Sequence, residues 1–133
     1  MMRLAACFGV PLDIVEPCGF ALDDQKLRRA GMDYIEKLDL TRHRSWEAFQ
    51  AEARGRMVLL TTQGGVTHTD FAFGPDDLIV VGRESAGVPP EIHQAANARI
   101  RIPMRAGVRS LNVAQAAAIA LAEALRQTGE LPT

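Results

Sequence analysis

Residues 78–127 read LIVVGRESAGVPPEIHQAANARIRIPMRAGVRSLNVAQAAAIALAEALRQ. Two short runs in it, 78–81 and 100–103, are rich in β-branched residues and stop at turn residues, which is typical of strands. Each run is followed by a loop and then by a sequence that favours a helix. Open α/β sheets bind their ligands in loops at the carboxyl ends of parallel strands. We therefore expect the functional site of the chain in this part of the sequence.

Three loops of the chain follow predicted apolar strands in this way. The first, residues 82–87, has Gly82 and Gly87 at its ends, so its backbone can approach a ligand closely. The second, residues 104–109, leads to Ser110, the predicted N-cap of a helix over 111–126. The third, Gln63-Gly64-Gly65, follows a strand predicted over 57–62, whose continuous apolar character indicates burial on both faces.

The other predicted elements alternate between helices and strands. They are a helix over 1–8 ended by Gly9, strands over 12–16 and 34–38, a loop over 41–44, and helices over 25–30, 46–53 and 90–96. This alternation predicts an α/β fold with a largely parallel sheet flanked by helices. A length of 133 residues favours one compact domain over 1–133.

Composition excludes some classes of function. The net charge is −1 and the pI is near 6.3, so no global basic field indicates nucleic acid, although a local patch can still bind phosphates. Cys7 and Cys18, the only two cysteines, suit neither a zinc site nor a disulfide framework, and no metal is expected. The sequence contains neither a membrane-spanning stretch nor a signal peptide, so we expect a cytoplasmic protein without a membrane partner.

Several charged residues have a plain structural interpretation beside a functional one. The densest positive cluster, on the predicted helix over 25–30, consists of Lys26, Arg28 and Arg29. From charge alone, a solvated helix face is favoured over a phosphate-binding patch. His43, between two arginines, is expected to be a solvated loop histidine rather than a catalytic base. His68 and Asp70 lie two residues apart in a loop, where such neighbouring side chains rarely converge into a catalytic dyad.

The three loops favour a small ligand held mainly by main-chain groups. No Gly-x-Gly-x-x-Gly follows a strand and no Walker loop is present. A concave, mostly apolar pocket formed by residues 61–65, 82–87 and 104–110 suits an adenine-bearing cofactor. The alternative, that these loops are simple connections, stays open on physical grounds alone.

Two motifs resemble those of the SpoU branch of the SPOUT methyltransferases. Residues 82–89, GRESAGVP, resemble the second family motif, and residues 100–104, IRIPM, with 110–114, SLNVA, resemble the third. The stretches 14–20, 23–24, 27–34 and 41–43 resemble the subgroup of single-domain enzymes that methylate the 2'-hydroxyl of nucleotide 34 of tRNA, cytidine or a modified uridine. The resemblance covers essentially the whole chain.

The resemblance implies a parallel α/β sheet with a deep trefoil knot in its C-terminal part, S-adenosylmethionine as cofactor, and a homodimer acting on the tRNA anticodon stem-loop. Main-chain groups of three strand ends, with two residues before the last helix, would hold the cofactor: Leu60, Gly82, Ile102, Ser110 and Leu111. Four further residues would line its pocket: Thr61, Glu84, Gly87 and Met104.

The resemblance also implies catalytic residues. Arg3 occupies the arginine position of the first family motif, where it would act as base or positioner, and Ser110 and Asn112 would orient the substrate. The basic residues Lys26, Arg28 and Arg29 would meet tRNA phosphates. The asparagine and glycine of that first motif would lie before Met1, so we expect a chain that is shortened at its start. The alternatives are a methyltransferase acting on rRNA or another tRNA position, and a non-catalytic binding remnant.

Overall fold

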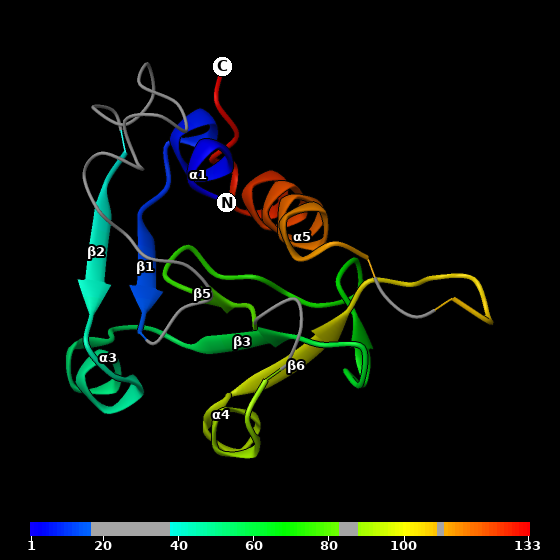
Figure 1. The fold of residues 1–133 in the computed structure, drawn as a ribbon. Coiled ribbons are helices and arrows are strands. Elements are labelled where there is room, and N and C mark those ends of the chain that lie inside the picture. The colour runs from blue at the N-terminus through cyan, green and yellow to red at the C-terminus, as the bar shows by residue number, and fades with distance from the viewer. Residues whose placement is uncertain (17–37, 83–87, 109–110) are drawn as a thin grey trace. The chain divides into compact units, whose positions relative to one another are not determined.

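The computed structural model describes residues 1–16, 38–82, 88–108 and 111–133 (Figure 1). The chain divides into two compact units, residues 1–53 with Pro132 and residues 54–131 with Thr133. The helix predicted over 25–30 lies outside the described residues. So does the strand predicted over 34–38, apart from Leu38, which is not in a strand. One domain over 1–133 remains a prediction.

The first unit begins with helix α1 (Met2–Phe8), which ends at Gly9 as predicted. Gly9 has a φ of 67°, a left-handed conformation that glycine adopts without strain, and its N–H donates to carbonyls of the last turn. Strand β1 (Leu12–Val15) follows and pairs in parallel with β2 (Leu40–His43). The pairing runs from Leu12 opposite Leu40 to Val15 opposite His43.

Strand β2 corrects the prediction of a loop over 41–44. Backbone hydrogen bonds join β1 and β2 at both ends of the pairing. The N–H of Leu12 donates to Asp39 O and the N–H of Glu16 donates to His43 O, both at 2.8 Å. His43 is buried rather than solvated, because its ring lies under helix α3 (Trp46–Glu52), in edge contact with Phe49. The predicted environment of this histidine was therefore wrong.

Helix α3 begins as the sequence indicates. Ser45 is its N-cap, and the Ser45 hydroxyl accepts a hydrogen bond from the N–H of Ala48 at 3.1 Å. The rings of Trp46 and Phe49, one turn apart, lie 5.4 Å from each other, and Phe49 is buried. The prediction that this pair belongs to the core is confirmed for Phe49, whereas Trp46 is half-buried.

The second unit contains a sheet of four parallel strands. Its spatial order is β4 (Val66–Thr67), β6 (Ala98–Arg101), β3 (Met57–Leu60) and β5 (Leu78–Val80). Strand β4 was not predicted, since two residues carry no periodic signal. Strand β6 begins two residues before the predicted start, and Asn97, which precedes it, accepts the N–H of Met57 at 2.7 Å. The α/β class with parallel sheets flanked by helices is confirmed.

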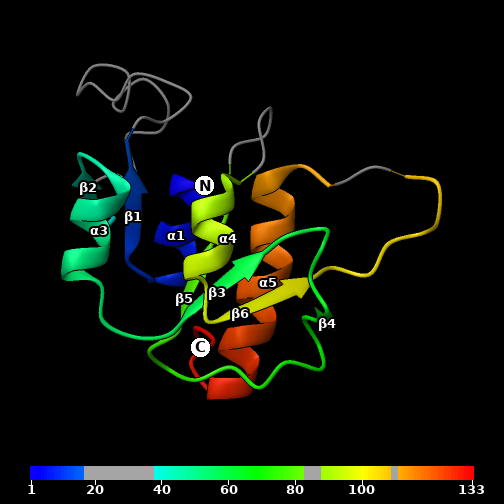
Figure 2. The same ribbon diagram turned by 90° about the horizontal axis from the view of Figure 1, so that it is seen from below.

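Two helices cover the sheet of the second unit. Helix α4 (Pro90–Ala95) and helix α5 (Val113–Thr128) lie on opposite faces (Figures 1 and 2). The N-cap of α5 is Asn112 rather than the predicted Ser110: the Asn112 side-chain oxygen accepts from the N–H groups of Ala114 at 2.9 Å and Gln115 at 3.3 Å. The buried alanines of α5 allow the helix to approach the sheet closely; they are Ala117, Ala120 and Ala124.

The loop between β4 and β5 is fastened by the Arg56 side chain. Its guanidinium donates to both carboxylate oxygens of Asp77, at 3.0 and 2.6 Å, and to Ala72 O at 2.9 Å. It also lies 4.7 Å from the centre of the Phe71 ring, a cation–π contact. Asp77 Oδ2, which accepts from Arg56, also accepts the N–H of Gly74 at 2.8 Å. One arginine thereby joins the start of β3 to this loop.

The Asp77 carboxylate makes the stability of this loop pH-dependent. Burial alone would raise its pKa, but the hydrogen bonds from Arg56 and Gly74 lower it below the ordinary value of 3.8. A carboxylate whose pKa is lower in the folded state stabilises the fold above pH 3.8, and this contribution is lost as pH falls through the folded-state pKa. We expect Asp77→Asn to cost about 1 kcal/mol at pH 7, since Arg56 is partly solvated.

Urea unfolding of the wild type and Asp77→Asn between pH 7 and pH 3 measures this effect. The gap between the two unfolding free energies should narrow below pH 3.8, because protonation then removes the same charge in the wild type. A gap that stays constant over this range would show that the carboxylate charge contributes nothing.

Candidate cofactor site at the strand ends

The carboxyl ends of three parallel strands meet at one edge of the second sheet. Strand β3 lies in the middle, with β5 on one side and β6 on the other. After β3 the chain forms β4 at the far side of β6, then β5 on the opposite side of β3, and finally β6 between β3 and β4. The strand order therefore reverses at β3, and such reversal points are where α/β sheets bind ligands.

The end of β3 turns tightly against β6. The N–H of Thr61 donates to Ile100 O at 2.9 Å, and Thr61 O accepts the N–H of Gly64 at 3.1 Å. The Thr61 hydroxyl accepts the N–H of Gln63 at 3.3 Å. The polar groups of Thr61 are thus used to shape the turn, so we expect Thr61 to line a ligand pocket rather than to bind through its main chain.

Gly64 lies in this turn, against the backbone of β6. A Cβ atom at Gly64 would lie 2.4 Å from the carbonyl carbon of Ile100, so only glycine fits there. The Arg101 guanidinium donates to Gly64 O at 3.0 Å and fixes the turn from the neighbouring strand. Gly64 and Arg101 were not singled out from the sequence, although the paired glycines at 64–65 marked the loop.

On its other side, β3 separates from β5 at the same edge. The last paired residues are Leu59 and Val80, so Leu60 and Gly82 lie beyond the pairing. Both are half-buried. The sheet therefore leaves main-chain groups near Leu60 and Gly82 outside the β3–β5 ladder, as a site built from backbone donors and acceptors requires. The predicted pocket residues Glu84 and Gly87 lie outside the described residues.

The loop after β6 leads away from the sheet (Figures 1 and 2). Ile102 is half-buried at its start, while Met104 is 37% exposed and Val108 59% exposed. Leu111 is half-buried where the chain returns before α5, and Ser110 lies outside the described residues. The predicted residues Ile102, Met104 and Leu111 are thus at the two ends of one long connection.

The other predicted site residues lie elsewhere or have other contacts. Arg3 is an exposed residue of α1, in the first unit. The predicted tRNA-binding residues Lys26, Arg28 and Arg29 lie outside the described residues. Asp70 accepts the Thr67 hydroxyl at 2.9 Å, and in the described part of the chain no hydrogen bond joins it to His68. The described residues therefore give no support to a catalytic dyad of His68 and Asp70, which the sequence also disfavoured.

Two further findings concern the described residues alone. Among residues 1–16, 38–82, 88–108 and 111–133, no group of three or more histidine, cysteine, aspartate or glutamate residues is arranged to hold a metal ion. In the same ranges, every helix is too short or too polar to cross a membrane.

Comparison with known proteins connects this architecture to a family. The sequence profile of the SpoU rRNA Methylase family matches residues 1–122. The tRNA (cytidine(34)-2'-O)-methyltransferase of Beijerinckia indica is 54% identical over 134 residues, covering 98% of this chain and 84% of the relative. The resemblance noted in the sequence is confirmed.

Solved structures show the same similarity. One, reported as "Structural insights into the 2-OH methylation of C/U34 on tRNA", is 38% identical with a TM-score of 0.86, covering 95% of this chain and 84% of that one. An AdoMet-bound rRNA methyltransferase from Sinorhizobium meliloti is 30% identical with a TM-score of 0.79, covering 94% of this chain and 49% of that one. With its family motifs, its fold and nearly its full length matched, this chain belongs to the SpoU rRNA Methylase family.

Proposed function

We propose that this protein is an S-adenosylmethionine-dependent methyltransferase that modifies the ribose 2'-hydroxyl of nucleotide 34 in tRNA. The observation that carries this proposal is the 54% identity, over 98% of the chain, to a tRNA (cytidine(34)-2'-O)-methyltransferase. The structural similarity to a protein studied for methylation of C/U34 on tRNA supports the same substrate. A tRNA substrate also favours a cytoplasmic location.

The strand ends of the second unit fit the proposed cofactor. Main-chain groups near Leu60 and Gly82, beyond the last β3–β5 pair, suit the hydrogen-bonding edges of an adenine. Ile102, Leu111 and Ser110 would add groups from the long connection, with Thr61, Glu84, Gly87 and Met104 around them. When bound, S-adenosylmethionine supplies an electrophilic methyl group on a sulfonium.

The chain's own residues must align the ribose hydroxyl and help to remove its proton. Arg3 is the proposed residue for this step. A guanidinium keeps its protons in proteins, so Arg3 would position the hydroxyl or act together with a nearby phosphate. The side-chain oxygen of Asn112 caps α5, so Asn112 would act as a positioning residue that fixes the start of α5.

The family resemblance adds two features to the proposal. One is a trefoil knot formed by the chain after β5, and the other is a homodimer in which a second copy completes the tRNA site. A domain of 133 residues offers little surface for an anticodon stem-loop, which favours a contribution from a second copy. Light scattering of the purified protein measures the proposed dimer.

A second candidate is methylation of ribosomal RNA. It is favoured by the family description and by the similarity to the rRNA methyltransferase of S. meliloti, although this chain covers only 49% of that protein. The same active-site chemistry serves both substrates, so only the modified nucleotide separates them.

A methyl-transfer assay tests the proposed function. The protein is incubated with labelled S-adenosylmethionine and either tRNA or rRNA from cells lacking the corresponding methylation, and the labelled nucleotide is mapped. We expect label on the ribose of tRNA nucleotide 34. The B. indica relative serves as the positive control. Label in rRNA alone would favour the second candidate, and cofactor binding without any transfer would indicate a non-catalytic binding protein.

A further inference from the structure

An open pocket of about 360 Å³ lies in the first unit, and none of its lining residues is assigned to the cofactor. It is formed by the carboxyl ends of β1 and β2 together with helix α3. Its lining residues are Glu16, Arg42, His43, Arg44, Ala48 and Glu52. It is therefore another site at the carboxyl ends of parallel strands, the usual position of ligand pockets in α/β proteins. Its volume is sufficient for a single nucleotide rather than a larger ligand.

His43 is the buried residue of the pocket lining. Its side chain is 6% exposed, and its Nε2 lies 2.8 Å from Asp13 Oδ1 on β1. On the other side, Nδ1 lies 3.8 Å from Glu52 Oε2, and the ring meets Phe49 edge-on at 5.2 Å. Contacts from β1 and α3 thus fix the ring on β2.

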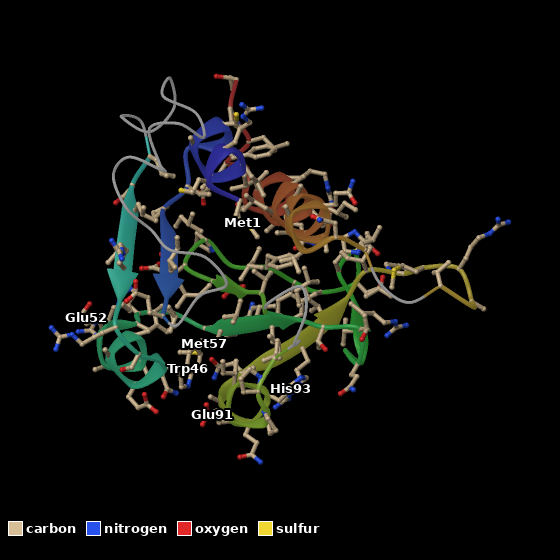
Figure 3. The ribbon with its side chains drawn as sticks, in the orientation of Figure 1. Met1, Trp46, Glu52, Met57, Glu91 and His93 are labelled. Carbon is tan, nitrogen blue, oxygen red and sulfur yellow. The ribbon has the colours of Figure 1, made fainter. Side chains whose placement is uncertain are left out.

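The rim of the pocket carries charges of both signs. Arg42 donates to Glu16 at 2.8 Å across the two strands, which neutralises that carboxylate. Arg44 is exposed, and within the described ranges no ion pair joins it to a carboxylate. The Glu52 carboxylate is 74% exposed, and Figure 3 shows this residue on α3. The pocket therefore offers a guanidinium and a carboxylate to the same ligand.

We propose that this pocket binds one unpaired nucleotide of the RNA substrate. Arg44 pairs with its phosphate, and Glu52 accepts a hydrogen bond from the amino group of its base. Guanidinium–phosphate pairs are strong and directional, and carboxylates accept from the exocyclic amino groups of bases. Unstacked loop nucleotides are the parts of RNA that proteins recognise by their base edges. This inference rests on the proposed RNA substrate and assigns it a second point of contact.

Binding of an unmodified anticodon stem-loop RNA, measured by fluorescence anisotropy, tests the proposal. Arg44→Ala should raise the Kd for this RNA about tenfold and reduce its salt dependence, because a phosphate contact is lost. Glu52→Ala should also raise the Kd, several-fold. A merely electrostatic role predicts the opposite sign for Glu52→Ala, since removing a negative charge then strengthens RNA binding. The Kd for S-adenosylmethionine and the melting temperature should stay at their wild-type values in both variants.

Arg99→Ala provides a matched control. Arg99 is an exposed arginine of β6, and its guanidinium donates to the carbonyl of His93. The same loss of charge there should leave RNA binding near the wild-type value. Wild-type RNA affinity in Arg44→Ala, or tighter binding in Glu52→Ala, would overturn the pocket assignment while leaving the proposed function intact. Failure of the wild type itself to bind or methylate tRNA would instead contradict the proposed function.

Discussion

Gly64→Ala is expected to lower the free energy of unfolding by about 3 kcal/mol, the upper end of the usual cost of overpacking. The new methyl carbon would lie 2.4 Å from Ile100 C, 2.5 Å from Ile100 O and 2.9 Å from Arg101 N. All three are backbone atoms of β6, which is held in register with β3, so no side-chain rotation can relieve the clash. Since the turn shapes the end of β3, S-adenosylmethionine binding should weaken as well.

Gly65→Ala is the control for this prediction. It is the neighbouring residue and the same change, but a Cβ there meets nothing within 4 Å. Urea unfolding and calorimetric titration with S-adenosylmethionine, carried out on both variants, measure the two effects. Equal unfolding free energies for the two variants would contradict the close approach of Gly64 to β6.

Arg3→Ala is expected to reduce the rate of methyl transfer at least a hundredfold, about the contribution of one group that aligns or deprotonates a nucleophile. The affinity for S-adenosylmethionine should not change, because Arg3 is proposed to act on the ribose hydroxyl and is not among the proposed cofactor-binding groups. Single-turnover assays with saturating tRNA separate the chemical step from RNA binding.

Arg3→Lys tests whether Arg3 positions the hydroxyl through its planar guanidinium or acts only through its positive charge. Lysine keeps the positive charge but lacks the planar fork of donors, so a positioning arginine should be replaced poorly and a simple charge well. Transfer by Arg3→Ala within a few-fold of the wild-type rate would show that the arginine of the first motif has no part in catalysis.

The elements that sequence predicted well are those with a strong local pattern. The apolar run that begins at Met57 became β3, with Val58 and Leu59 fully buried, and the alanine-rich stretch became α5. Gly9 ended α1, and Ser45 capped α3, because their backbone chemistry acts within a few residues. Such signals do not depend on the rest of the fold.

The errors arose where distant contacts decide the structure. Residues 41–44, Thr-Arg-His-Arg, look like a polar loop, yet 41–43 form a strand because β1 supplies backbone partners almost thirty residues away. His43 is buried by Asp13 and Phe49, which no local pattern reveals. Ser110 and Asn112 are equally good helix caps by type, and only the path of the chain selects Asn112.

The candidate site could be predicted in outline only. Strand ends and glycines located it, because open α/β sheets bind ligands at that edge. The individual roles of Leu60, Gly82, Ile102 and Arg3 came from motif resemblance, and they stay predictions. The pocket around His43 could not be found in the sequence, since its lining comes from β1, β2 and α3 together.

The position of β3 in its sheet has a consequence for the chain during translation. β3 leaves the ribosome before both of its neighbours, and α5, whose Ala124 packs with Val58, is made last. Until residue 101 has emerged, one edge of the most apolar strand has no partner, and until residue 128 one of its faces is incompletely covered. Between the emergence of β3 and the release of α5, the nascent protein therefore exposes an aggregation-prone strand to other chains and to chaperones.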